Sequence, residues 1–115
     1  MSKLSAEQIV QKQLDCYNNR DIEGYIALFS ENVKFFDHAT REVTIKGVDA
    51  CREMYQSLFD TSPNLKSTII KRIVMGNVVI DHESIVGRKG SDEVLELILV
   101  FEVEEGLIGK VTVIR

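Results

Sequence analysis

The sequence predicts one α+β domain, with helices in the first half of the chain and a run of strands in the second. The 115 residues are enough for one hydrophobic core and too few for two, so we expect a single domain over 1–115. Before residue 60, apolar residues recur every three or four positions in three segments. After Leu65, four β-rich runs are separated by short turn signals, which favours an antiparallel meander.

Local signals place each element in order. Ser5 followed by Gln8 forms a capping box that begins the first helix, and Asp21 can cap a second, shorter helix. Pro63 follows the third helix as a stop signal. The predicted elements are helices over 5–19, 22–29 and 48–59, and strands over 32–38, 42–45, 65–75, 78–86, 93–103 and 107–114.

The charge and hydropathy of the chain exclude several classes of partner. The net charge is −4, whereas nucleic acids and anionic membrane surfaces require a concentrated positive field. The first residues are polar, and no later run approaches the roughly 18 apolar residues of a membrane span. We therefore expect a cytoplasmic protein with no nucleic-acid or membrane partner.

The cysteines and histidines give no metal pattern. Cys16 and Cys51 lie far apart in predicted helices, beside apolar positions, where a free cysteine behaves as a small hydrophobic residue. His38 and His82 are too few and too separated for a metal site, unless the fold gathers them with Asp37. We expect neither a metal nor a cofactor.

Asp37 is the sharpest chemical feature of the sequence. It ends the predicted strand 32–38 and shares a face with Val33 and Phe35. Apolar neighbours would raise the pKa of this carboxyl group toward the range useful for a general base. Alternatively, Asp37 bonds to the backbone of the following turn and stays in water. Both interpretations remain open at this point.

Three other polar residues have two possible roles each. Gln13 and Tyr17 are one turn apart on the first helix, so both can face a cavity, although the Tyr17 ring can equally pack in the core. His82 lies among the aliphatic residues Val78 and Ile80, either as a satisfied core histidine or as a donor to a pocket.

The order of elements and several motifs resemble the nuclear transport factor 2-like superfamily, and within it the SnoaL-like and ketosteroid-isomerase-like branch of small bacterial proteins. The residues that carry the resemblance are Asn19-x-Asp21-Ile22-Glu23-Gly24-x-x-x-Leu28-Phe29-Ser30-Glu31-Asn32-Val33, then Phe36-Asp37, then Ile45-x-Gly47-x-x-x-Cys51-x-x-x-Tyr55. The resemblance implies a strongly curved antiparallel sheet wrapped into a cone and packed against three N-terminal helices, a cystatin-like α+β barrel. It also implies a deep apolar pocket and a homodimer formed through the outer sheet face.

The resemblance also suggests a chemistry. Asp37 falls where ketosteroid isomerases place the aspartate that moves a proton next to a carbonyl group. The family's oxyanion-binding tyrosine corresponds to Gln13 here, and its protonated acid falls near Leu99. Losing one such donor costs on the order of 3 to 4 kcal/mol of transition-state stabilisation, which argues against an orthodox steroid isomerase. The candidate replacements are Tyr17, Tyr55 and His82.

Two functions follow from these expectations. The first is an isomerase or cyclase that transfers a proton on a small apolar carbonyl compound, with Asp37 as general acid/base. Its ligand, small and apolar or polycyclic, would contact Gln13, Tyr17, Phe35, Tyr55, His82 and Leu99. The alternative is a non-catalytic module of the same fold that binds an apolar ligand or dimerises. The strand around 94–101 is apolar on one face and partly so on the other, which favours a second subunit as its cover.

Overall fold

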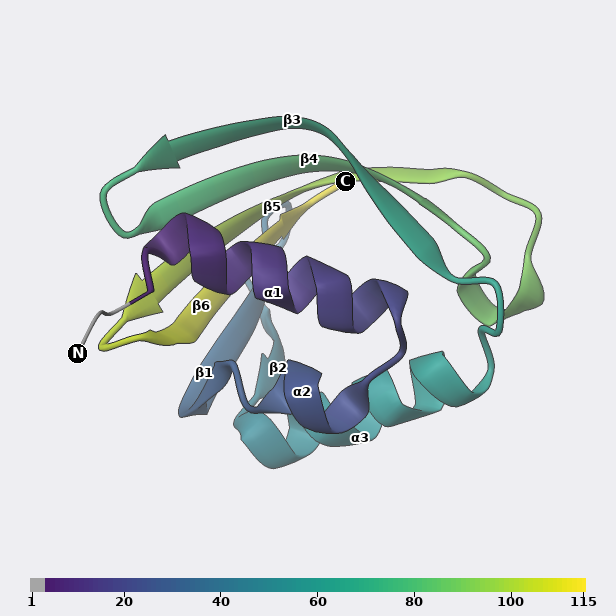
Figure 1. Ribbon diagram of the computed structural model, residues 1–115, viewed down its shortest axis with the longest axis horizontal. Coiled ribbons are helices and arrows are strands. Elements are labelled where there is room, and N and C mark those ends of the chain that lie inside the picture. The colour runs from purple at the N-terminus through teal and green to yellow at the C-terminus, as the bar shows by residue number, and fades with distance from the viewer. Residues whose placement is uncertain (1–3) are drawn as a thin grey trace.

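The computed structural model describes residues 4–115, in which three helices lie against one face of a six-stranded sheet (Figure 1). The helices are α1 (Ala6–Asn18), α2 (Ile22–Ile26) and α3 (Val48–Asp60). The strands are β1 (Phe29–Asp37), β2 (Val43–Lys46), β3 (Lys66–Met75), β4 (Val78–Val86), β5 (Leu95–Glu104) and β6 (Leu107–Ile114). A short 3₁₀ helix, η1 (Arg88–Gly90), lies in the connection between β4 and β5.

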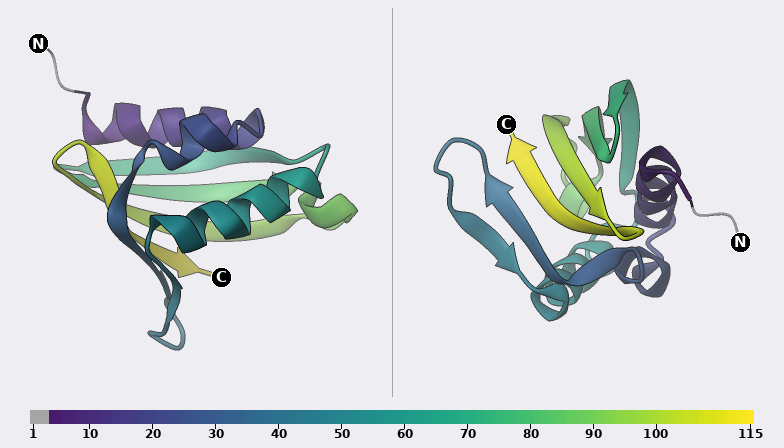
Figure 2. Two further views of the ribbon diagram at one scale, coloured as in Figure 1. Left: turned by 90° about the horizontal axis from the view of Figure 1, so that it is seen from below. Right: turned by 90° about the vertical axis from the view of Figure 1, so that its left-hand side faces the viewer.

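The sheet has the strand order β2-β1-β6-β5-β4-β3 and bends around the helices, as both views of Figure 2 show. Four neighbouring pairs are antiparallel, but β1 and β6 are parallel. The expectation of a wholly antiparallel sheet is therefore corrected to a mixed one. The parallel contact arises because β6 is the last strand of the β3–β6 meander and meets β1, which is distant in sequence. The sheet stays open, with β2 and β3 at its edges, so it does not close into a barrel.

Helix α1 begins as its sequence predicts and is attached to the sheet at its middle and at its C-terminal end. Ser5 and Gln8 form the reciprocal capping box. In the middle of the helix, the Arg72 guanidinium donates to Gln11 Oε1 at 2.9 Å and also pairs with Asp81. At the C-terminal end, Asn18 exchanges two hydrogen bonds with the backbone of β3. The concave face of the sheet is thereby covered by α1.

The register of β4 determines which of its side chains face the helices. Val79, Asp81, Glu83 and Ile85 are buried, whereas the residues between them face outward. Successive side chains of a strand point to opposite faces, so His82 lies on the convex side. The interpretation of His82 as a core histidine is therefore wrong, because the covered face of β4 is the one that carries the acids.

Six aromatic rings from α1, α2, α3 and β1 pack against one another in the core. Tyr25 is at the centre, with ring centroids 4.7 Å from Tyr55, 4.9 Å from Phe29 and 5.6 Å from Phe59. Offset or tilted aromatic pairs at such distances add to the free energy gained by burial. Cys51, expected in the core, is fully buried. This cluster forms one wall of the site described next.

Candidate functional site

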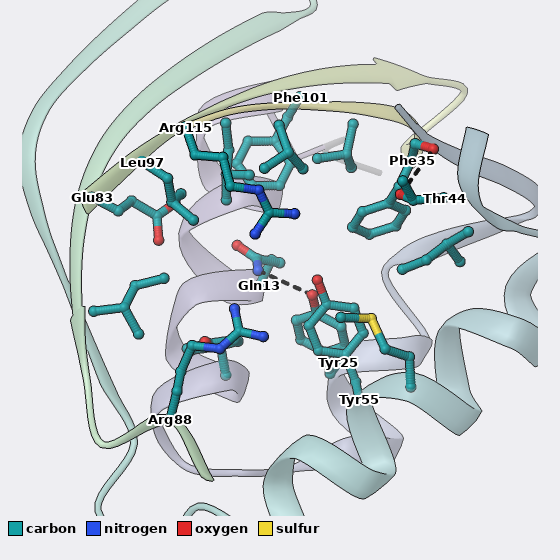
Figure 3. A pocket seen from close by; sticks show the side chains of 17 residues that line it. Gln13, Tyr25, Phe35, Thr44, Tyr55, Glu83, Arg88, Leu97, Phe101 and Arg115 are labelled. Atoms are coloured by element: carbon teal, nitrogen blue, oxygen red, sulfur yellow. Dashed lines mark hydrogen bonds between the residues drawn. The ribbon is translucent and has the colours of Figure 1, made fainter. Parts of the chain in front are cut away.

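A cavity of about 90 Å³ lies between the concave face of the sheet, α1 and α3 (Figure 3). Its apolar lining comes mainly from the central strands. These side chains are Ile85, Leu97, Leu99, Phe101, Val111 and Val113. Polar groups enter the same cavity from α1, α2, α3 and the strand ends. They are Gln13, Tyr17, Tyr25, Thr44, Tyr55, Glu83, Arg88 and Arg115. A mostly apolar hollow with a few converging polar groups is the usual form of a small-molecule site.

Most of the residues expected to contact a ligand line this one cavity. They are Gln13, Tyr17, Phe35, Tyr55 and Leu99. Gln13 and Tyr17 lie on the α1 face turned toward the sheet, as their four-residue spacing predicted. The fold thus brings these five side chains together, and their role in binding stays a prediction.

Asp37 is not among the lining residues of the cavity. The backbone N–H of Thr40 donates to its Oδ2 at 2.9 Å, in the turn that follows β1. Hydrogen bonds from the Thr40 backbone and side chain lower the pKa of Asp37, and the nearby Arg115 charge adds to this effect. The expectation that apolar neighbours raise the pKa is therefore wrong, and the turn interpretation describes the geometry.

His82 also lies away from the cavity. Its Nε2 is 2.5 Å from Glu96 Oε1 on the convex face of the sheet, where both side chains contact solvent. Because β4 separates this face from the cavity, His82 cannot donate a hydrogen bond into it. The prediction that it contacts the ligand is corrected for that reason.

Glu83 is the titratable group that sequence reasoning missed. Its side chain is buried in the cavity wall, with only 4% of the residue exposed. Ser67 Oγ donates to Oε1 at 2.5 Å, whereas Oε2 has no hydrogen-bond partner within residues 4–115. Burial raises the pKa of Glu83 to about 7, with a further contribution from Asp81. The alternation of Val79, Glu83 and Ile85 on one face was visible in the sequence, but it did not show that this face is the covered one.

Gln13 and the tyrosines supply neutral hydrogen-bonding groups. Gln13 Nε2 donates to Tyr25 Oη at 3.4 Å, and Gln13 Oε1 has no partner in the described part of the chain. Burial raises the pKa of Tyr17 to about 12 and the pKa values of Tyr25 and Tyr55 further. All three hydroxyl groups therefore keep their protons at neutral pH.

No group of three or more His, Cys, Asp or Glu side chains within residues 4–115 is arranged to hold a metal ion. In the same range, no helix is long and apolar enough to cross a membrane. Burial raises the pKa of the Cys51 thiol to about 12, so this cysteine is a poor nucleophile.

The curved sheet, the helical cover and the enclosed cavity define the class of cone-shaped α+β pocket proteins. A family model for the SnoaL-like domain matches residues 10–111, and the chain belongs to this family, which is part of the nuclear transport factor 2-like superfamily. None of the curated proteins compared with this chain matches it.

Several solved structures share the fold at low sequence identity. An uncharacterised cystatin-fold protein from Novosphingobium aromaticivorans has a TM-score of 0.88 at 19% identity, with 97% of this chain and 99% of that chain covered. A candidate ketosteroid isomerase from Kribbella flavida gives 0.81 at 23% identity, with 94% and 75% covered. A candidate SnoaL-like polyketide cyclase from Jannaschia gives 0.76 at 14% identity, with 98% and 88% covered. These likenesses show the fold and leave the activity to be argued from the site.

Proposed function

We propose that this protein transfers a proton on a small carbonyl compound bound in the cavity, with Glu83 as the general acid/base. The observation that carries the proposal is the buried Glu83 carboxyl group in the cavity wall, one oxygen of which has no hydrogen-bond partner among the described residues. Buried polar atoms are nearly always hydrogen-bonded, so an orphaned one in a cavity wall favours a ligand as its partner.

The chemistry requires a base that can also return the proton. The Glu83 carboxylate would remove a proton from the carbon next to the carbonyl group, breaking the C–H bond and leaving an enolate. The same carboxyl group then gives the proton back, to that carbon or to a conjugated one. A pKa near 7 populates both forms of Glu83 at neutral pH, which suits this exchange.

The enolate oxygen needs hydrogen-bond donors, and the residues at the family's usual positions, Gln13 and Leu99, do not supply the usual ones. The hydroxyl groups of Tyr17 and Tyr55 line the same cavity and keep their protons, so they are the proposed replacements. Donors fixed in an apolar site stabilise a developing oxyanion because no reorganisation is needed during the reaction.

Asp37 as the acid/base remains a prediction that the same experiments test. A lowered pKa makes its carboxylate a weaker base than that of Glu83. Its position at the end of β1 also leaves it outside the cavity lining.

The size of the cavity favours a compact substrate. About 90 Å³ of free volume is below the usual range for drug-sized ligands. A polycyclic ligand would therefore require lining side chains such as Met54 to move.

The proposal predicts exchange of the α-protons of a small ketone. We would incubate cyclohexanone with the protein in deuterated buffer and follow the loss of its α-proton signals by NMR. Glu83→Gln should reduce the protein-dependent rate at least ~100-fold, the usual lower range for a general base. Asp37→Asn is the matched control and should keep the rate.

Two outcomes would contradict this assignment. Unchanged exchange in Glu83→Gln would remove Glu83 from the reaction, and loss of exchange in Asp37→Asn alone would restore the original assignment to Asp37. The alternative of a non-catalytic binding module is favoured by Gln13 and Leu99, which occupy the positions where the family places its oxyanion donors. Ketone-induced shifts of cavity resonances without any exchange would support that alternative.

A further inference from the structure

The charged residues that line the cavity are mostly positive, whereas the net charge of the protein is negative. The chain carries a net charge of −4, yet two of the three charged residues lining the cavity are arginines, Arg88 and Arg115. Figure 3 shows both guanidinium groups pointing into the cavity from different sides. The Gln13 side chain lies between them in this view. Among residues 4–115, neither arginine forms an ion pair or a side-chain hydrogen bond.

Arg88 is held in place by an unusually close loop contact. Gly87 has a φ of +79°, and a Cβ at this position would clash with the Asn64 carbonyl oxygen. The next peptide group is fixed as well, since Lys89 N–H donates to the buried Ser62 Oγ at 2.8 Å. The Arg88 backbone is therefore set between two anchored residues. Its charge acts on the pKa values of Tyr17 and Tyr55, opposing the effect of burial.

Arg115 approaches from the end of β6. It follows Val113 by two residues, and alternate residues of an extended chain share a face, so both contribute to the cavity wall. Val113 pairs with Leu99 in the register of β5 and β6, and Leu99 also lines the cavity. Among residues 4–115, the only acidic side chain in the lining is that of Glu83, which belongs to β4. The Asp37 carboxylate is close enough for Arg115 to lower its pKa, but no ion pair joins the two.

We infer that the ligand of this cavity carries a carboxylate group, which Arg88 and Arg115 hold while its carbon skeleton packs against Phe35, Leu97 and Phe101. Guanidinium groups bind carboxylates through paired, charge-assisted hydrogen bonds of matching planar geometry. Apolar walls strengthen this attraction because they lower the local dielectric constant. A carboxylate is also a small planar anion, which suits a cavity of about 90 Å³.

This inference rests on the proposed function and narrows its substrate to a small oxo acid, a compound with both a carbonyl and a carboxylate group. The carboxylate would be bound by the two arginines and would leave the carbon next to the carbonyl exposed to Glu83. The unpaired Gln13 Oε1 offers an acceptor for a hydroxyl or enol proton of the same ligand. No other charged group is required from the described lining.

The test compares benzoate with its neutral analogue benzamide, each titrated into the ¹⁵N-labelled protein at constant ionic strength. We expect benzoate to bind at least about 10-fold more tightly than benzamide, since a hydrogen bond to a charged group contributes that much or more. Arg88→Gln and Arg115→Gln should each weaken benzoate binding about 10-fold and leave benzamide binding unchanged. Lys89→Gln is the control, because it removes an adjacent positive charge that does not line the cavity.

The outcomes separate this inference from the proposed function. Equal affinity for benzoate and benzamide, or benzoate binding that Arg88→Gln and Arg115→Gln do not weaken, would overturn the inference, as would an equal effect of Lys89→Gln. Glu83→Gln should still bind benzoate although it loses ketone exchange. If cyclohexanone exchange is retained but benzoate is not preferred over benzamide, the inference of a carboxylate ligand is wrong and the proposed acid/base reaction still stands.

Discussion

Within residues 4–115, Glu83 is a carboxyl group that folding removes from water without giving it a cationic partner. Asp81, two residues earlier on the same face, accepts two hydrogen bonds from Arg72, at 2.6 and 2.9 Å. Glu83 receives a neutral donor, Ser67, which stabilises its charged form less than an arginine would. The proton is therefore the simplest partner for Glu83 when no ligand is bound.

This burial makes the stability of the protein depend on pH. The pKa of Glu83 is about 7 in the folded protein and near 4.5 when exposed, so its contribution is fully present below about pH 4.5 and is lost as pH rises through 7. The loss amounts to about 3 kcal/mol of unfolding free energy, from the size of the pKa shift. Urea unfolding of the wild type and Glu83→Gln between pH 4.5 and 8 measures it. The variant should show a flatter profile, and parallel profiles would mean that Glu83 titrates normally.

At the scale of secondary-structure elements, the connections fix the site as much as the helices and strands do. The β4–β5 connection presses against the segment that follows α3, and only a residue without a side chain allows this approach at Gly87. Gly76, in the β3–β4 turn, also has a positive φ, but a Cβ there would meet nothing within 4 Å. Both glycines have a positive φ, but only Gly87 has a close neighbour. Comparing the two positions therefore separates the effect of the steric contact from the effect of the backbone conformation.

Replacing each glycine by alanine tests this difference. Gly76→Ala should cost about 1 kcal/mol of unfolding free energy, the usual penalty of a positive φ for a residue with a Cβ. Gly87→Ala should cost clearly more, because the backbone of Asn64 has to move as well. Urea unfolding of the two variants gives the comparison. Similar losses of unfolding free energy in both variants would show that the Asn64 backbone moves away from the new side chain without a measurable loss of stability.

The elements that the sequence predicts well are those with local signals. The capping box at Ser5 begins α1, and the strands over 78–86 and 107–114 end where the turn residues indicated. The parallel contact of β1 with β6 could not be predicted in this way, since it joins segments about 75 residues apart and no local pattern records it. Helix α2 ends earlier than expected because Phe29 already pairs with Ile108 of β6.

The site was predicted unevenly for a similar reason. Gln13 and Tyr17 were found because helical spacing defines a face by itself. Asp37 was expected among apolar neighbours and Glu83 was not singled out, because the burial of a strand residue depends on which face a distant helix covers. Arg88 lies between two predicted strands, where no local pattern marked it as a site residue, and its backbone is positioned by the contact of Gly87 with Asn64.

At the scale of the whole molecule, no helix within the described residues covers the convex face of the sheet. Ile73, Ile80 and Val100 form a cross-strand row on this face, and Ile73 and Met75 are 54% and 80% exposed. Apolar side chains gathered on an open sheet face favour association with another surface. We expect a homodimer through this face, as the resemblance implied.

A charge placed in the row tests that expectation. Ile73→Asp should convert a dimer into a monomer, because pairing would bury an uncompensated carboxylate. Light scattering coupled to size exclusion measures the mass of each form. Val94→Asp is the control, as Val94 is 64% exposed but lies outside the row. A wild-type protein that stays monomeric at high concentration would contradict the interface.

The anchoring of Arg88 has a mechanical consequence. Through Gly87 and Lys89, Arg88 is attached to the segment that follows α3, whereas Arg115 follows the last residue of β6. The two guanidinium groups are therefore anchored to different parts of the molecule, one to the segment after α3 and one to the sheet. An anion bound by both would act as a reversible crosslink between these parts, so that the rigidity of the fold would depend on ligand occupancy.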